Sequence, residues 1–285
     1  MLQGGIGDVL FFFCSGFTLF LGRMGRFDNW YKRRINRIYP TVFAWAILGA
    51  FLFDRHYDMQ HTIISGGGWF VTCIMMYYVV LYFVRRYMMK YLIWVFTVVF
   101  VSCGLWFALT KTPTDFNMYG NTYFKWFHYF LFMMMGAMMG ISQKKNTYRF
   151  GLDCIKLLAS IVLFYVLSAF KGIPSYNKLQ FLSIVPLICT AFYFYKISQS
   201  DTLKHIYFHK IWGISIRFIG GLCLEIYLVQ GALFTDKMNF LFPLNLPIMF
   251  LIILIAAYIL RCSARIFAQT FKDGGYDWKA VVKAI

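Results

Sequence analysis

A short basic segment, Phe27–Pro40, carries the residues of this sequence whose types and spacing suit phosphate binding. Within it, Arg33 or Arg34 and Arg37 are three or four positions apart, so a helix brings their side chains to one face. A planar guanidinium group can donate two hydrogen bonds at once to phosphate oxygens. The segment therefore predicts a polyphosphate site, although the same charges also suffice to orient a membrane helix.

The flanks of this segment indicate where helices begin. Asp28 is a residue type that caps helix N-termini. Pro40 lies near the start of the apolar run Ile38–Phe53, where its missing N–H costs little. We therefore expect the arginines to lie at the entrance of a membrane-spanning helix.

Few ionisable residues interrupt the apolar runs, and Glu225 is the most informative of them. It lies near the middle of the run Ile214–Phe234, and a carboxylate in hydrocarbon faces the interior of the bundle or water. A functional role and a structural pair with Arg217 or Tyr227 both remain open. Gln230, five residues further along, can serve an interhelical hydrogen bond and nothing more.

The elements that must position these residues are nine mostly apolar stretches. A bilayer core about 30 Å thick needs about 20 helical residues, so we predict an all-α polytopic membrane bundle with about nine transmembrane helices, in one domain over residues 1–285. A composition of 60% hydrophobic and 14% charged residues excludes an ordinary soluble domain. The predicted spans are Ile6–Gly22, Ile38–Phe53, Gly68–Val84, Tyr91–Leu109, Trp126–Ile141, Leu152–Phe170, Leu179–Ile197, Ile214–Phe234 and Leu246–Leu260.

Lysine and arginine gather in every second gap between these spans, and the net charge of the chain is +17. Positive residues mark the cytoplasmic side, so we predict a cytoplasmic C-terminus and an N-terminus on the outer side. This pattern accounts for the charge without nucleic acid and makes the lipid bilayer the expected partner. The seven cysteines lie in or beside apolar runs without metal-binding spacing, so we expect neither a metal site nor a disulfide framework.

Several segments, taken in order, resemble the acyltransferase-3 family of bacterial membrane proteins. One is similar to the family's phenylalanine-rich helix ending in Ser-Gly-Phe, one to its Arg-Arg-x-x-Arg-Ile-x-Pro signature, and others to its Trp-Phe, Gly-x-x-x-Gly and late Tyr-Leu-x-His helices. The segments are GDVLFFFCSGFTLF (Gly7–Phe20), YKRRINRIYP (Tyr31–Pro40), GGWFVTCIMMYYVVLYF (Gly67–Phe83), KWFHYFLFMMMGAMMG (Lys125–Gly140) and LCLEIYLVQ (Leu222–Gln230).

Members of that family are ten-helix enzymes that move an acyl group, commonly acetyl, from acyl-coenzyme A to a sugar hydroxyl. The resemblance implies that Arg33, Arg34 and Arg37 meet the coenzyme A phosphates from the cytosol. It also implies that Trp69 and the segment Glu225–Gln230 line the acceptor side. The expected partners are acyl-coenzyme A, as a co-substrate with no bound cofactor, and a glycan or glycolipid acceptor at the bacterial inner membrane.

The sequence also departs from the family pattern. The family's histidine-bearing first helix has no counterpart here, and Gln230 stands where many members have histidine. A hydroxyl acceptor needs a base within hydrogen-bond reach, and Asp8 and His128 are the polar candidates at the outer side. Three interpretations follow: a membrane O-acyltransferase represented without its first helix, an acyltransferase-like protein without catalysis, or a transporter of glycans or lipids.

Overall fold

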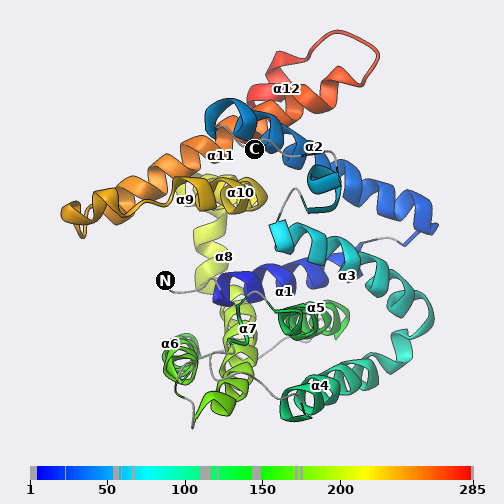
Figure 1. The fold of residues 1–285 in the computed structure, drawn as a ribbon, viewed down its shortest axis with the longest axis vertical. Helices are drawn as coiled ribbons and strands as arrows, with labels where there is room; N and C mark the ends of the chain where they lie inside the picture. The colour runs from blue at the N-terminus through cyan, green and yellow to red at the C-terminus, as the bar shows by residue number, and fades with distance from the viewer. Residues whose placement is uncertain are drawn as a thin grey trace. The chain divides into compact units, whose positions relative to one another are not determined.

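The computed structural model describes residues 5–22, 24–53, 58, 60–65, 68–109, 117–120, 122–142, 149–170, 173 and 176–283. Every regular element in these ranges is a helix, which confirms the all-α prediction (Figure 1). The chain divides into two compact units, each built from separated stretches. Unit 1 combines Met1–Met24 with Tyr77–Lys204, and unit 2 combines Gly25–Met76 with His205–Ile285.

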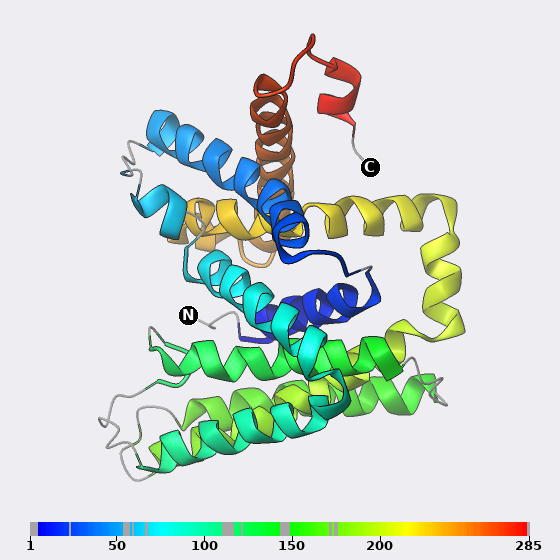
Figure 2. The same ribbon diagram turned by 90° about the vertical axis from the view of Figure 1, so that its right-hand side faces the viewer.

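Unit 1 is built around the contact between its first helix and α5. A Cβ atom added to Gly136 would lie 2.0 Å from the carbonyl oxygen of Phe13, and one added to Gly16 would lie 1.9 Å from that of Met133. Only glycine permits so close an approach of two backbones, and the two helices lie side by side in Figures 1 and 2. The helices of this unit are α1 (Gly5–Leu21), the second half of α3 (Gly68–Tyr87), η2 (Met89–Tyr91), α4 (Leu92–Leu109), α5 (Phe124–Ser142), α6 (Phe150–Ala169), η3 (Asn177–Ser183) and α7 (Ile184–Ser198).

Unit 2 has its core where α2, α10 and α11 pack together. Trp45 and Ala44 are buried there in one cluster with residues of the other two helices, including Leu228 and Ala257. The helices of this unit are α2 (Phe27–Phe53), η1 (His61–Ser65), the first half of α3, the second half of α8 (Asp201–Phe208), α9 (Lys210–Gly221), α10 (Cys223–Leu233), η4 (Asp236–Leu241), α11 (Asn245–Thr270) and α12 (Trp278–Val282).

Six of the described helical segments are long and apolar enough, by length and composition, to cross a membrane. The pair α9–α10 makes a seventh if it forms one span, and α1 is a shorter apolar helix. Helix α5 is the remaining segment that we predict to span. The chain is therefore a multi-pass membrane protein, and the count of about nine helices stays a prediction. The six segments are Phe27–Phe53, Gly68–Tyr87, Met89–Leu109, Phe150–Ala169, Asn177–Ser198 and Asn245–Thr270.

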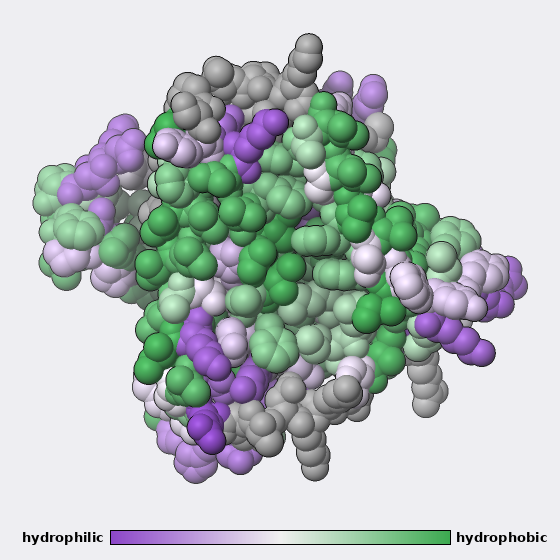
Figure 3. Space-filling view, turned by 90° about the horizontal axis from the view of Figure 1, so that it is seen from below, coloured by the Kyte–Doolittle hydropathy of each residue, from purple (hydrophilic) through white to green (hydrophobic). Residues whose placement is uncertain are grey.

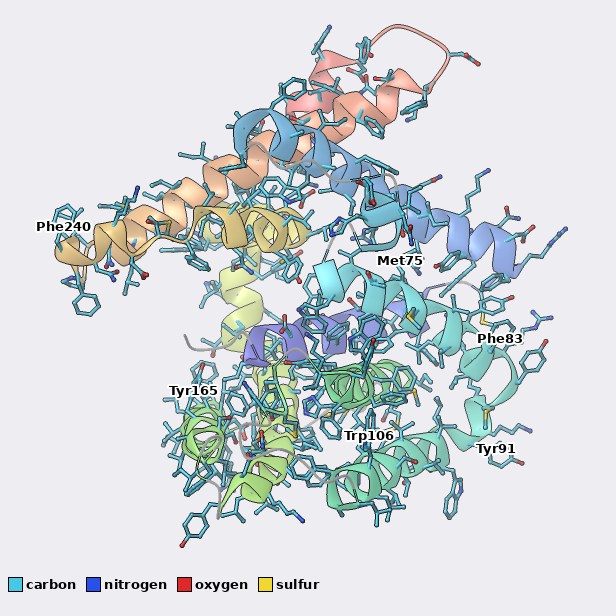
Figure 4. All side chains as sticks on the ribbon, in the orientation of Figure 1. Met75, Phe83, Tyr91, Trp106, Tyr165 and Phe240 are labelled. Atoms are coloured by element: carbon cyan, nitrogen blue, oxygen red, sulfur yellow. The ribbon has the colours of Figure 1, made fainter. Side chains whose placement is uncertain are left out.

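The surface has the character expected next to lipid. Figure 3 shows a face on which hydrophobic side chains cover a broad central area, while hydrophilic side chains gather toward its margins. Phe83, Tyr91 and Phe240 are exposed and extend away from the ribbon in Figure 4. In water such surface would be unfavourable, whereas lipid tails are as apolar as these side chains.

The basic segment and the apolar run that follows it form one continuous helix, α2, which begins at Phe27. Pro40 therefore lies well inside a helix, and the expectation that it lies near a helix start is wrong. A proline in the interior leaves the carbonyl of the residue four positions earlier, here Asn36, without its helical N–H. The buried residues Thr41, Val42 and Trp45 that follow show that packing maintains the helix across this position.

The run Ile214–Phe234 is broken rather than continuous. The axes of α9 and α10 differ by 68°, and Leu222, which is fully buried, stands between them. Gly220 and Gly221 precede the break, and glycines are a recognised cause of sharp kinks. Glu225 remains near the middle of the run, as predicted, but it lies in the first turn of α10 rather than inside one continuous helix.

Candidate functional site

Helix α2 carries the three arginines of the basic segment in two different environments. Arg33 and Arg37 are exposed, whereas Arg34 is half-buried, and its guanidinium carbon lies 5.2 Å from the centre of the Trp30 ring. Viewed down the helix axis, positions 33, 34 and 37 lie within an arc of about 100°, with Arg37 between the other two. The buried Trp30 ring holds Arg34 through a cation–π contact, so this arginine is fixed in place while its neighbours face outward.

The same helix leads from the arginines to a buried carboxylate. Arg34 and Thr41 are seven residues apart, which corresponds to about 10 Å along a helix axis and to nearly the same face. Thr41 is buried, and its side chain forms a hydrogen bond with the carboxylate of Glu225 on α10. The basic end of α2 is therefore linked to Glu225 within unit 2.

Glu225 is 7% exposed and lies among arginines of α11. Its own backbone N–H bonds to the carboxylate, and the charges of Arg261 and Arg265 attract it. Arg217, which the sequence offered as a partner, lies instead over the ring of Tyr207, with its guanidinium carbon 5.5 Å from the ring centre. Of the alternatives left open, a pair with Arg217 is thus not formed, and the arginines near Glu225 come from the last long helix.

The break between α9 and α10 lets one of these arginines approach closely. A Cβ atom on Gly221 would lie 2.7 Å from Nη1 of Arg261, so a larger residue would displace the guanidinium. The carbonyl end of α9 favours a cation and the N–H end of α10 favours an anion. Arg261 near the end of α9 and Glu225 in the first turn of α10 both satisfy this electrostatic preference.

Arg265 also fixes the C-terminal segment. Its Nη1 donates to the carbonyl of Val281 at 2.9 Å and to that of Lys283. The hydroxyl of Tyr258 donates to the carbonyl of Val282 at 2.6 Å. These bonds hold α12 against α11, so Arg265 is shared between Glu225 and the chain end.

The residues expected on the acceptor side have separate surroundings. The ring of Trp69 lies edge-on to Phe70, and Phe70 contacts Tyr227 of α10, with ring centres 4.7 Å apart. Gln230 is half-buried, and its backbone carbonyl accepts a hydrogen bond from the backbone N–H of Phe234 at 3.0 Å. Positions 225 and 230 are about 140° apart around a helix, so Glu225 and Gln230 do not share a face.

Asp8 lies on α1 facing the start of α5. The phenol of Tyr129 donates a hydrogen bond to its carboxylate, and the charge of Lys125 attracts it. Lys125 is buried, although lysine is seldom buried without a partner. Asp8 itself remains partly exposed, so this carboxylate combines a charged neighbour, a hydrogen-bond donor and access from outside.

His128 is enclosed in aromatic rings. Its side chain is 0% exposed, and both ring nitrogens are buried without a hydrogen-bond partner among the residues that the structure describes. The rings of Tyr119 and Tyr129 meet it edge-on, with centres 5.4 Å and 4.9 Å away. Phe124 and Phe132 add two more aromatic neighbours, so aromatic rings surround this histidine.

The structure thus brings Arg34 and Glu225 into one unit, and in the other unit both Asp8 and His128 contact Tyr129. Arg261 and Arg265 near Glu225 are not among the site residues predicted from the sequence. Their spacing of four residues places them on one face of α11, and that spacing was the available signal.

Comparison with protein families gives one relevant result. A family model described as an acyltransferase domain matches residues 2–262, which is most of the chain. No curated protein and no solved structure matches the sequence.

Proposed function

Because the chain belongs to the acyltransferase-3 family, we propose that it is a membrane-bound O-acyltransferase that moves an acyl group, with acetyl the expected one, from acyl-coenzyme A to a hydroxyl of a surface or secreted glycan. The family establishes a membrane acyltransferase in general. The donor, the acceptor and the location in a bacterial inner membrane are parts of the proposal.

One observation carries the donor assignment: the arginine-bearing end of α2 continues without a break into the apolar part of the same helix. Guanidinium groups recognise phosphates by paired hydrogen bonds. Arg34, held over Trp30, and Arg37, exposed beside it, would receive the phosphates of coenzyme A. The acyl arm would then run along α2 toward the core of unit 2.

The reaction transfers the acyl carbon from sulfur to oxygen. The glycan hydroxyl attacks the thioester carbonyl, a C–O bond forms, the C–S bond breaks, and coenzyme A leaves as its thiol. The hydroxyl proton must pass to a base as the C–O bond forms. Asp8 is the candidate that fits this role, because it is partly exposed whereas His128 is enclosed.

The proposal is tested with membranes that contain the chain, supplied with radiolabelled acetyl-coenzyme A. We expect label on a glycan fraction, and we expect Arg37→Ala to raise the KM for acetyl-coenzyme A about tenfold, the effect of losing one charge-assisted hydrogen bond. Arg26→Ala is the matched control, because Arg26 is exposed and pairs with Asp28 at 3.1 Å. An absence of label on any glycan, with Arg37→Ala indistinguishable from the parent, contradicts the proposal.

The break at Leu222 favours a second candidate, transport of a glycan or lipid. Discontinuous membrane helices expose backbone groups that bind substrates in transporters, and α9–α10 is such a pair. A transporter would move an already acylated glycolipid across vesicles without consuming acetyl-coenzyme A. Uptake of labelled glycolipid that is independent of acetyl-coenzyme A distinguishes this candidate from the first.

A further inference from the structure

The buried site at the α9–α10 break contains two polar atoms whose hydrogen-bonding needs are complementary. In its ionised form Glu225 accepts hydrogen bonds through Oε2, and Nη1 of Arg261 can only donate. Within the described part of the chain, both atoms are buried and neither has a hydrogen-bond partner. The two charges attract each other, yet no ion pair joins these two side chains.

Leaving these two buried polar atoms unpaired costs free energy unless a third group forms hydrogen bonds with both. A buried charged group without a partner loses the hydrogen bonds it had in water, and buried polar atoms in native proteins are almost always paired. The glycine at position 221 keeps the position beside Arg261 free of a side chain. A group that donates to Oε2 and accepts from Nη1 would satisfy both atoms, and an amide or a hydroxyl has that chemistry.

We propose that Glu225 and Arg261 form a clamp for an amide of the pantetheine arm of the acyl donor. The inference rests on the proposed function, because it assumes that the donor's phosphates bind at Arg34 and Arg37. The two sites share α2: Thr41, which bonds to Glu225, lies about 10 Å along the helix from Arg34. A donor with phosphates at one end and amides along an extended arm matches that order of sites.

This clamp places Glu225 on the donor side, whereas the sequence suggested the acceptor side. Glu225 positions the arm and takes no proton in the reaction. Arg265 contributes to holding Glu225, because it attracts the carboxylate and is itself fixed by the carbonyl of Val281.

The test compares coenzyme A with adenosine 3′,5′-bisphosphate, which has the nucleotide phosphates but no pantetheine arm. Binding to the purified chain in detergent is measured by calorimetry. We expect Glu225→Gln and Arg261→Gln each to weaken coenzyme A binding about tenfold, since each removes a hydrogen bond to a charged group. Neither variant should change the affinity for the bisphosphate. Arg34→Ala should weaken both ligands.

Arg217→Gln is the matched control, because it removes an arginine of the same unit that lies over Tyr207. Its affinity for coenzyme A should equal that of the parent, and all variants should keep the parental melting temperature within a few degrees. Equal weakening of both ligands by Glu225→Gln would overturn the clamp and make this site part of the phosphate site. Unchanged coenzyme A binding with a raised KM for the glycan would overturn it in favour of an acceptor hydroxyl. A parent chain that binds neither ligand would overturn the donor site itself.

Discussion

Single residues of the same chemical type have very different surroundings in this protein, and Asp8 and Asp153 are an example. Asp8 faces Tyr129 and Lys125 and remains partly exposed. Asp153 is buried and forms an ion pair with Lys196 at 2.9 Å. A proton acceptor must reach its substrate, so the partly exposed carboxylate is the one suited to chemistry.

We predict that Asp8→Asn lowers kcat for acyl transfer at least 100-fold and leaves the KM for acetyl-coenzyme A within about threefold, because an amide cannot accept the hydroxyl proton. Single-turnover assays with labelled donor measure both constants. Asp153→Asn is the control: loss of its ion pair with Lys196 should lower the melting temperature while kcat in intact protein stays near the parental value. Equal activity of Asp8→Asn and the parent would remove Asp8 from the reaction.

His128 gives the opposite expectation. We predict that His128→Phe keeps acyl transfer and raises the free energy of unfolding by about 1 kcal/mol, because a phenylalanine suits the aromatic cage and removes buried, unpaired nitrogens. Melting temperature in detergent and turnover with acetyl-coenzyme A are the measurements. A 100-fold loss of turnover in a stable His128→Phe protein would instead make this histidine the base.

At the level of elements, glycine decides where backbones meet. The pair α1 and α5 depends on Gly16 and Gly136, each of which would place a Cβ atom within 2.0 Å of a carbonyl oxygen on the other helix. In the sequence, Gly136 and Gly140 form a Gly-x-x-x-Gly pattern, which is typical of close helix packing. Only the structure shows that α1 is the helix that fits against it.

We predict that Gly136→Ala lowers the free energy of unfolding by about 3 kcal/mol, because the new methyl group forces α1 and α5 apart. Thermal unfolding in detergent measures the change. Gly151→Ala on α6 is the matched control, since nothing lies within 4 Å of its added Cβ atom, and it should be neutral or slightly stabilising. If the two substitutions had the same effect, close packing at Gly136 would not explain the association of these helices.

The α9–α10 pair shows that hydropathy can locate an apolar segment without predicting whether its helix is bent. An apolar run from Ile214 to Phe234 is long enough to be one span, and its composition alone does not say whether it is straight. The two glycines before Leu222 are a local signal for a kink. The bend of 68° depends on packing, because Leu222 is fully buried against α2 and α11.

For the whole molecule, the distribution of basic residues determines how the chain is expected to lie in the bilayer. Arg261, Arg265 and the lysines of the tail follow the last predicted span, and short basic segments stay on the cytoplasmic side. Two of these arginines also take part in the buried cluster around Glu225. One residue can therefore contribute both to orientation and to a site.

We predict that the C-terminus lies in the cytoplasm. A fluorescent protein fused after Ile285 should fluoresce in a bacterial host, and alkaline phosphatase fused at the same point should be inactive. Fusions after Leu241, at the end of η4, should give the reverse result. Active phosphatase after Ile285 would contradict the orientation derived from the basic residues.

The sequence by itself determined the class of the protein, because the length of an apolar run and the position of a basic residue act locally: they place each segment in lipid or in water without reference to other segments. It also determined the family and the arginine segment that resembles its signature. Tertiary structure decided which of these residues meet. Arg34 lies against Trp30 rather than in solvent, Glu225 faces Arg261 rather than Arg217, and His128 is sealed among rings. Such contacts depend on how helices that are far apart in the sequence pack together and on where those helices bend. The local sequence around each residue predicts neither.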